Sequence, residues 1–97
     1  MTKADLVRSV SAETGIIRKD VALAVDAFLE SLKDSLKDGK HIEIRGFGTF
    51  KLKVRKERMG RNPKTEEKVK VPARVVPTFK FSRALKEDID AANQNLL

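Results

Sequence analysis

Residues 42–58 read IEIRGFGTFKLKVRKER, and in this stretch the spacing of the apolar side chains changes from a helical period to a period of two. The two isoleucines alternate with charged residues, Gly-Phe-Gly at 46–48 predicts a turn, and the alternation then resumes as far as about Arg58. Residues 68–76 alternate in the same way, and two phenylalanines continue the pattern. The sequence therefore predicts a three-stranded antiparallel sheet in which the last two strands form a long hairpin.

The chain before this sheet is predicted to form two helices. Thr2 can cap the first, an apolar stripe follows it, and Gly15 supplies a left-handed stop, so a helix is expected over residues 2–14. A second helix is expected from about 18 to 38, because its apolar residues repeat at helical spacing. Its start is weakly signalled, since Ile17 stands where a polar cap is expected.

After the sheet, Ser82 is a candidate cap for a last helix, which is followed by a short tail at about 91–97. No repeat or low-complexity linker divides the chain, so we expect one α+β domain over residues 1–97. Within this domain, residues 55–72 are expected to form a flexible ribbon arm. The length leaves no room for an enzyme with separate cofactor and substrate lobes.

The positive charge is concentrated in the middle of the chain. Lys and Arg number 21 against 14 Asp and Glu, which gives a net charge of +7. Residues 45–81 hold twelve of the bases and three of the acids, a net charge of +9, whereas residues 1–44 and 82–97 each carry −1. A charge that only improved solubility could equally well be dispersed. An excess confined in this way is typical of a binding site for a polyanion.

One face of the predicted hairpin is basic, because alternate residues of a strand share a face. It carries Lys51, Lys53, Arg55, Lys68, Lys70 and Arg74. Between residues 56 and 67 the only apolar side chains are Met59 and Pro63, so this stretch cannot bury a core. We expect it to project into solvent and to become ordered when it binds a ligand.

The composition excludes several classes of site. The chain has no cysteine and only one histidine, His41, so disulfides, thiolate metal sites and multi-histidine metal sites are ruled out. There is no apolar run of about 20 residues and no secretory signal at the N-terminus. The bases lie on strands instead of a basic amphipathic helix, which disfavours binding to an anionic membrane. We expect a small cytoplasmic protein without metal, cofactor, membrane partner or enzymatic activity.

The tip of the predicted ribbon carries Gly-Arg-Asn-Pro-Lys-Thr at 60–65. Together with Gly-Phe-Gly-Thr-Phe at 46–50, it closely resembles the signature of the HU and integration host factor family of bacterial DNA-bending proteins. The resemblance covers about residues 2–90. It implies an intertwined dimer with a helical base and two β-ribbon arms that embrace the minor groove, and this family is a standard example of that binding mode.

The resemblance also implies roles for individual residues. Pro63 would be a wedge that enters a base step, with Arg61 and Asn62 beside it in the groove. The arm would be lined by the basic residues Lys53, Arg55, Arg58, Lys64, Lys68, Lys70 and Arg74. Phosphates near the saddle between the arms would be bound by Arg45, the amides of Gly46 and Gly48, Lys3, Lys80 and Lys86. The dimer core would contain Phe28, Leu32, Phe47, Phe50 and Phe79.

We therefore expect an architectural protein that binds, bends and compacts duplex DNA in the bacterial nucleoid, as a homodimer with the low sequence preference of HU. The alternative is a site-preferring protein like integration host factor, for which a heterodimer with a paralogue is conceivable. RNA binding is a weaker alternative, because the usual RNA modules stack bases on sheet aromatics and the five Phe here fall at apolar core positions. In one departure from the family, Glu66 stands where Gly is usual.

Overall fold

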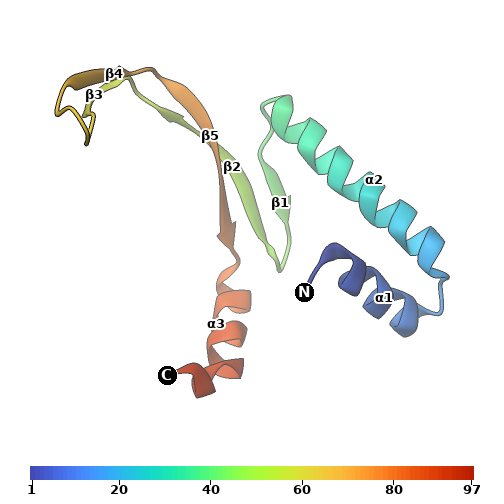
Figure 1. The fold of residues 1–97 in the computed structure, drawn as a ribbon. Coiled ribbons are helices and arrows are strands. Elements are labelled where there is room, and N and C mark those ends of the chain that lie inside the picture. The colour runs from blue at the N-terminus through green and yellow to red at the C-terminus, as the bar shows by residue number, and fades with distance from the viewer. The chain divides into compact units, whose positions relative to one another are not determined.

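The structure is a computed structural model that describes all 97 residues, and the chain folds as two compact units (Figure 1). Met1–Asp38 contains two helices, and Gly39–Leu97 contains the strands and the last helix. None of the helices combines the length and the apolar composition that crossing a bilayer requires. The elements agree with the predicted α+β class.

The first helix, α1, spans Lys3–Thr14 and has the predicted signals at both ends. The N–H of Thr2 donates to Oδ2 of Asp5 over 2.9 Å, and the hydroxyl of Thr2 accepts from the N–H of Asp5 over 3.4 Å. This capping box satisfies backbone donors that a helix start leaves open. Gly15 follows at φ 77°, in the left-handed conformation that ends the helix.

The second helix, α2, spans Arg18–Lys37 and packs against α1. Ile17 gives it no side-chain cap, as the sequence indicates, and the helix ends one residue before the predicted limit. Val7 of α1 and Val21 of α2 are 8% and 4% exposed, and they are the only buried hydrophobic residues of the whole chain. A single chain therefore has almost no core of its own.

The second unit contains a three-stranded antiparallel sheet in the order β1-β2-β5. Its strands are β1 (Ile42–Ile44), β2 (Gly48–Arg55) and β5 (Arg74–Phe81). The turn between β1 and β2 is closed by a 2.9 Å hydrogen bond from the N–H of Phe47 to the carbonyl of Ile44. The sheet, its order and its turn agree with the prediction.

Beyond this sheet the hairpin continues as a second, separate pair of strands, β3 (Arg58–Arg61) and β4 (Lys68–Val71) (Figure 1). The prediction of two uninterrupted strands, reaching about Arg58 and running through 68–76, was wrong on this point. Pairing stops at residues 56–57 on one side and 72–73 on the other. Pro72 lacks an N–H and cannot donate to the ladder, which explains the break.

The last helix, α3 (Arg83–Ala92), begins at Ser82 as predicted. The hydroxyl of Ser82 accepts from the N–H of Leu85 over 3.2 Å and donates to the carbonyl of Gly46 over 3.1 Å. Its N–H also donates to the carbonyl of Phe47 over 2.8 Å. Ser82 therefore joins the start of α3 to the β1–β2 turn. The tail contains one turn of 3₁₀ helix at Gln94–Leu96, which was not predicted.

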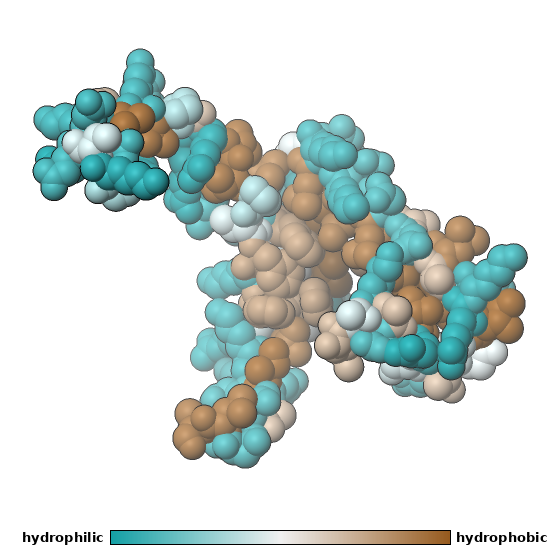
Figure 2. Space-filling model, viewed as in Figure 1, coloured by the Kyte–Doolittle hydropathy of each residue, from teal (hydrophilic) through white to brown (hydrophobic).

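Aromatic rings gather on one side of the three-stranded sheet. The ring centroids of Phe50 and Phe79 are 4.6 Å apart, and those of Phe79 and Phe81 are 4.8 Å apart. Phe47 lies 5.5 Å from Phe79, yet it remains 44% exposed. Figure 2 shows hydrophobic side chains at the surface over this part of the molecule. In one chain the aromatic cluster is incompletely covered.

Candidate nucleic-acid interface

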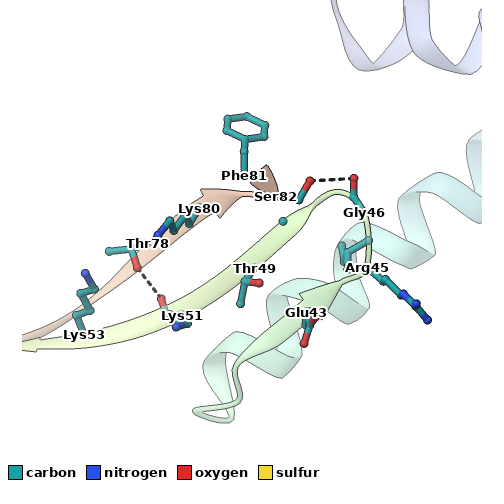
Figure 3. A pocket seen from close by; sticks show the side chains of 12 residues that line it. Glu43, Arg45, Gly46, Thr49, Lys51, Lys53, Thr78, Lys80, Phe81 and Ser82 are labelled. Atoms are coloured by element: carbon teal, nitrogen blue, oxygen red, sulfur yellow. Dashed lines mark hydrogen bonds between the residues drawn. The ribbon is translucent and has the colours of Figure 1, made fainter. Parts of the chain in front are cut away.

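A basic cavity of about 410 Å³ lies on the β1-β2-β5 sheet and its turn (Figure 3). Residues directly opposite each other in an antiparallel pair share a face, and Thr49 is opposite Lys80 while Lys51 is opposite Thr78. Lys53 continues this row along β2 (Figure 3). The cations that line the cavity are Arg45, Lys51, Lys53 and Lys80, and Glu43 is its only acid.

Two glycines of the predicted site shape the rim of this cavity. Gly46 has a φ of 80°, in the left-handed region that favours glycine. Gly48 is buried, and a Cβ on it would lie 2.6 Å from the carbonyl oxygen of Lys80 and would also overlap the ring of Phe79. Gly48 therefore permits the close approach of β2 and β5.

Sequence reasoning missed several residues of the cavity. Lys51 was placed on the basic face but not among the residues implied to bind DNA, and Thr49, Thr78 and Ser82 were not considered as site residues. All four line the cavity. The period-two alternation carries the signal for the first three, because each lies on the same face as Lys53 or Lys80.

A second basic cavity, of about 400 Å³, lies between the two sheets, where the strand pairing of the hairpin is interrupted. Its cations are Arg55, Lys56, Arg58 and Arg74, and Glu57, Val71 and Pro72 complete the lining. Beside this cavity, Oε1 of Glu57 is 3.2 Å from Nζ of Lys70, so an exposed ion pair joins the two sides of the hairpin. We call residues 56–57 and 72–73, with this cavity, the elbow.

The pairing of β3 and β4 distributes the bases of the ribbon over two faces. Arg61 is opposite Lys68, and Lys70 lies two residues further along on the same face. Arg58 is opposite Val71 and lies on the other face. The continuous basic face predicted from the sequence is therefore divided between the two sheets, with Arg74 in the larger one.

The loop at the end of the ribbon, residues 62–67, presents Pro63 to solvent. The N–H of Asn62 donates to the carbonyl of Glu67 over 2.9 Å, and the carbonyl of Asn62 accepts from the N–H of Glu66 over 2.7 Å. Oδ1 of Asn62 accepts from the N–H of Lys64 over 3.0 Å. The loop is therefore closed by its own hydrogen bonds, and it exposes an apolar ring between Asn62 and Lys64.

Two predicted site residues lie on helices and not on the sheets, the β1–β2 turn or the tip loop. Lys3 belongs to the first unit, where Nζ is 2.7 Å from Oδ1 of Asp26. Lys86 lies on α3. Of the predicted dimer-core residues, Phe47, Phe50 and Phe79 cluster on the sheet, whereas Phe28 and Leu32 lie on α2, and Phe28 is 56% exposed.

The sequence and the fold were compared with known proteins. A family model described as "Bacterial DNA-binding protein" matches residues 1–90. An integration host factor subunit alpha of Xylella fastidiosa (strain M12) is 43% identical over 91 residues, which cover 94% of this chain and 92% of the relative. DNA-binding protein HU of Thermus thermophilus is 45% identical over 89 residues, with 92% of each chain covered.

The fold is also similar to solved structures of HU proteins. The chain is similar to HU in an Anabaena HU–DNA cocrystal structure, with a TM-score of 0.83, 35% identity, and coverage of 92% of this chain and 97% of the other. It is also similar to HU from Thermotoga maritima, with a TM-score of 0.65, 31% identity, and coverage of 92% and 98%.

Proposed function

Because the chain belongs to the bacterial DNA-binding protein family of HU and the integration host factor subunits, we propose that its two cavities hold the backbone of duplex DNA while Pro63 enters the minor groove. Members of this family are architectural DNA-binding proteins.

The observation that carries this proposal is the series of cations along the hairpin from the sheet to the tip loop, which occupies both faces of the ribbon. Lys80, Lys51 and Lys53 line the cavity on the sheet, and Arg55, Arg58 and Arg74 line the elbow. Arg61 and Lys68 follow at the end of the ribbon, and Lys64 lies in the tip loop. Cations at intervals along an extended ribbon suit the regular phosphates of a duplex, and each neutralised phosphate releases counterions.

Pro63 is the proposed wedge. It is exposed at the end of the ribbon, in a loop whose other side chains are polar or charged. An apolar side chain that enters a base step unstacks it at a cost of roughly a few kcal/mol, which is offset by the contacts that bent DNA makes with the protein. The compact ring of proline suits this task because inserting it costs no side-chain rotamer freedom.

The proposed working form is a homodimer. One chain buries only two hydrophobic residues and leaves its aromatic cluster partly exposed. Pairing two chains through Phe47, Phe50 and Phe79 removes this apolar surface from water and places two ribbon arms on one molecule. We propose Phe28 and Leu32 of α2 as further members of the same core.

We favour low sequence preference, as in HU, over site preference, as in integration host factor. The minor groove distinguishes little beyond A·T from G·C pairs, and the proposed contacts are mainly to phosphates. Names of both kinds occur among the relatives, so they do not decide between the two. We further propose a location in the nucleoid and no catalytic activity.

A competition assay tests the proposed function. A labelled random duplex is bound at low salt and displaced by unlabelled intact duplex, nicked duplex or double-stranded RNA, and the series is repeated as salt rises. Nicked duplex should compete best, because a nick lowers the cost of bending, and RNA should compete worst. Equal competition by RNA, or an affinity that does not change with salt, would contradict the proposal.

A further inference from the structure

The hydrogen bonds of the tip loop, residues 62–67, converge on Asn62. Its backbone N–H and carbonyl bond to Glu67 and Glu66, and its side-chain Oδ1 accepts from the N–H of Lys64. Asn62 is also the only residue of this loop that is partly buried, because the other five are exposed. The backbone of Asn62 therefore closes the loop, and its side chain adds one further bond within the loop.

The bond from Lys64 to Oδ1 of Asn62 bridges the proline between them. Such an Asx turn fixes the backbone of the asparagine and of the residue after it, as a backbone turn would. The ring of Pro63 already fixes its own φ, and a residue before proline is restricted to extended conformations. The direction of the ring relative to β3 and β4 depends on the backbone freedom that remains at Asn62, and the bond to its side chain restrains that freedom further.

We propose that Asn62 is a positioning residue that aims Pro63 before DNA is bound. This inference rests on the proposed function, because the direction of the ring matters only if the ring enters a base step. Without the Asx turn, the loop would have to be ordered during binding, and the ring would enter the step less completely. Asn62 then affects the bend of the DNA through Pro63.

The resemblance to the family implies instead that Asn62 contacts DNA directly, and the chemistry of its side chain separates the two explanations. Oδ1 accepts one bond within the loop, and the minor groove presents mainly acceptors, so the groups that Asn62 chiefly offers to DNA are the two hydrogens on Nδ2. Asn62→Asp keeps the acceptor and removes these donors. Asn62→Ser keeps a shorter acceptor that also forms such turns, without adding charge. Asn62→Leu keeps the branching at Cγ and removes both functions.

The bend is measured by fluorescence energy transfer across an end-labelled duplex at saturating protein, so that differences in affinity do not enter. We expect Asn62→Asp and Asn62→Ser to bend DNA as the unchanged protein does, and Asn62→Leu to fall to the value of Pro63→Ala. Thr65→Val is the matched control. It removes a 3.4 Å bond from the N–H of Glu67 to Oγ1 of Thr65, which does not bridge the proline, and it should keep the full bend.

A double-mutant cycle completes the test. If Asn62 acts through Pro63, Asn62→Leu should cause no further loss of bend in a protein that already carries Pro63→Ala. The positioning role would be overturned if Asn62→Leu reduced the bend of the Pro63→Ala protein by as much as it reduces the bend of the unchanged protein. It would also be overturned if Asn62→Asp and Asn62→Ser reduced the bend as much as Asn62→Leu does. An unchanged bend with Pro63→Ala alone would instead overturn the proposed wedge, so the two failures are distinguishable.

Discussion

Glu66 is the only residue other than glycine with a positive φ, at 58°. This left-handed conformation costs a residue with a Cβ about 1–2 kcal/mol relative to its preferred conformations. The carbonyl of Glu67, which accepts from the N–H of Asn62, lies beyond Glu66 in the chain, so the conformation of Glu66 helps to direct the returning strand toward that bond. The sequence marked this position only as a departure from the family's usual Gly, and the structure supplies the physical cost.

Replacing Glu66 separates strain from charge. Glu66→Gly should raise the hydrogen-exchange protection of the Asn62 amide in the free protein by about fivefold, which corresponds to about 1 kcal/mol. Glu66→Gln should leave this protection unchanged, because it keeps a Cβ. Both variants should bind duplex DNA more tightly than the unchanged protein, since both remove a negative charge beside the phosphates. Equal protection in the two variants would show that the turn is not strained.

Gly48 is constrained by packing. A Cβ there would lie 2.6 Å from the backbone oxygen of Lys80, which cannot move without displacing β5. Gly48→Ala should destabilise the protein by about 1–3 kcal/mol in denaturant unfolding. Gly60→Ala is the control, because its Cβ would press only lightly on the side chain of Val71, at 3.2 Å, and would lie at an ordinary contact distance of 3.8 Å from the carbonyl oxygen of Val69. Similar losses in both variants would contradict a specific constraint at Gly48.

Among the elements, the helix ends were the most predictable from sequence. Helix starts are capped by local hydrogen bonds from Thr2, Asp5 and Ser82, and α1 is ended by the left-handed conformation of Gly15. These effects do not depend on the rest of the fold. The elbow was not predicted, although Pro72 carried a signal: a residue without an N–H breaks a ladder. The alternation on both sides of it outweighed that signal in the prediction.

The part of the candidate site that depends on local sequence was predictable, and the part that depends on strand pairing was not. Alternation along a strand assigns Lys51 and Lys53 to one face wherever the strand lies. It does not reveal which residues of the other strand are opposite, so the grouping of Arg58 with Val71 required the structure. Nor does it reveal whether an asparagine side chain will bind its own backbone, as Asn62 does, or a ligand.

The ion pair of Glu57 and Lys70 at the elbow restrains a base that the ribbon would offer to DNA. Glu57→Gln should strengthen duplex binding at low salt by about two- to fivefold, because an exposed pair of this kind holds Lys70 by no more than about 1 kcal/mol. Glu87→Gln is the matched control, since Glu87 pairs with Arg83 on α3, away from the ribbon. An equal gain in the control would assign the effect to overall charge.

For the whole molecule, the sparse core predicts that folding and dimerisation are coupled. With only Val7 and Val21 buried in one chain, the aromatic cluster must supply its stabilisation between chains. Thermal unfolding should therefore shift to higher temperature as protein concentration increases. The check is a dilution series by circular dichroism, with sedimentation at the same concentrations. A stable monomer at micromolar concentration, with a constant midpoint, would contradict the coupling.

The bend of a duplex at saturation tests most directly whether Pro63 acts as a wedge. End-labelled DNA is titrated with the unchanged protein and with Pro63→Ala, and energy transfer and affinity are measured on the same duplex. Pro63→Ala should reduce the bend more than the affinity, because Lys53, Arg55 and Arg74 still hold phosphates. Its thermal stability should be unchanged, since Pro63 is exposed in the free protein. An equal bend in both proteins at saturation would show that Pro63 is only a turn residue.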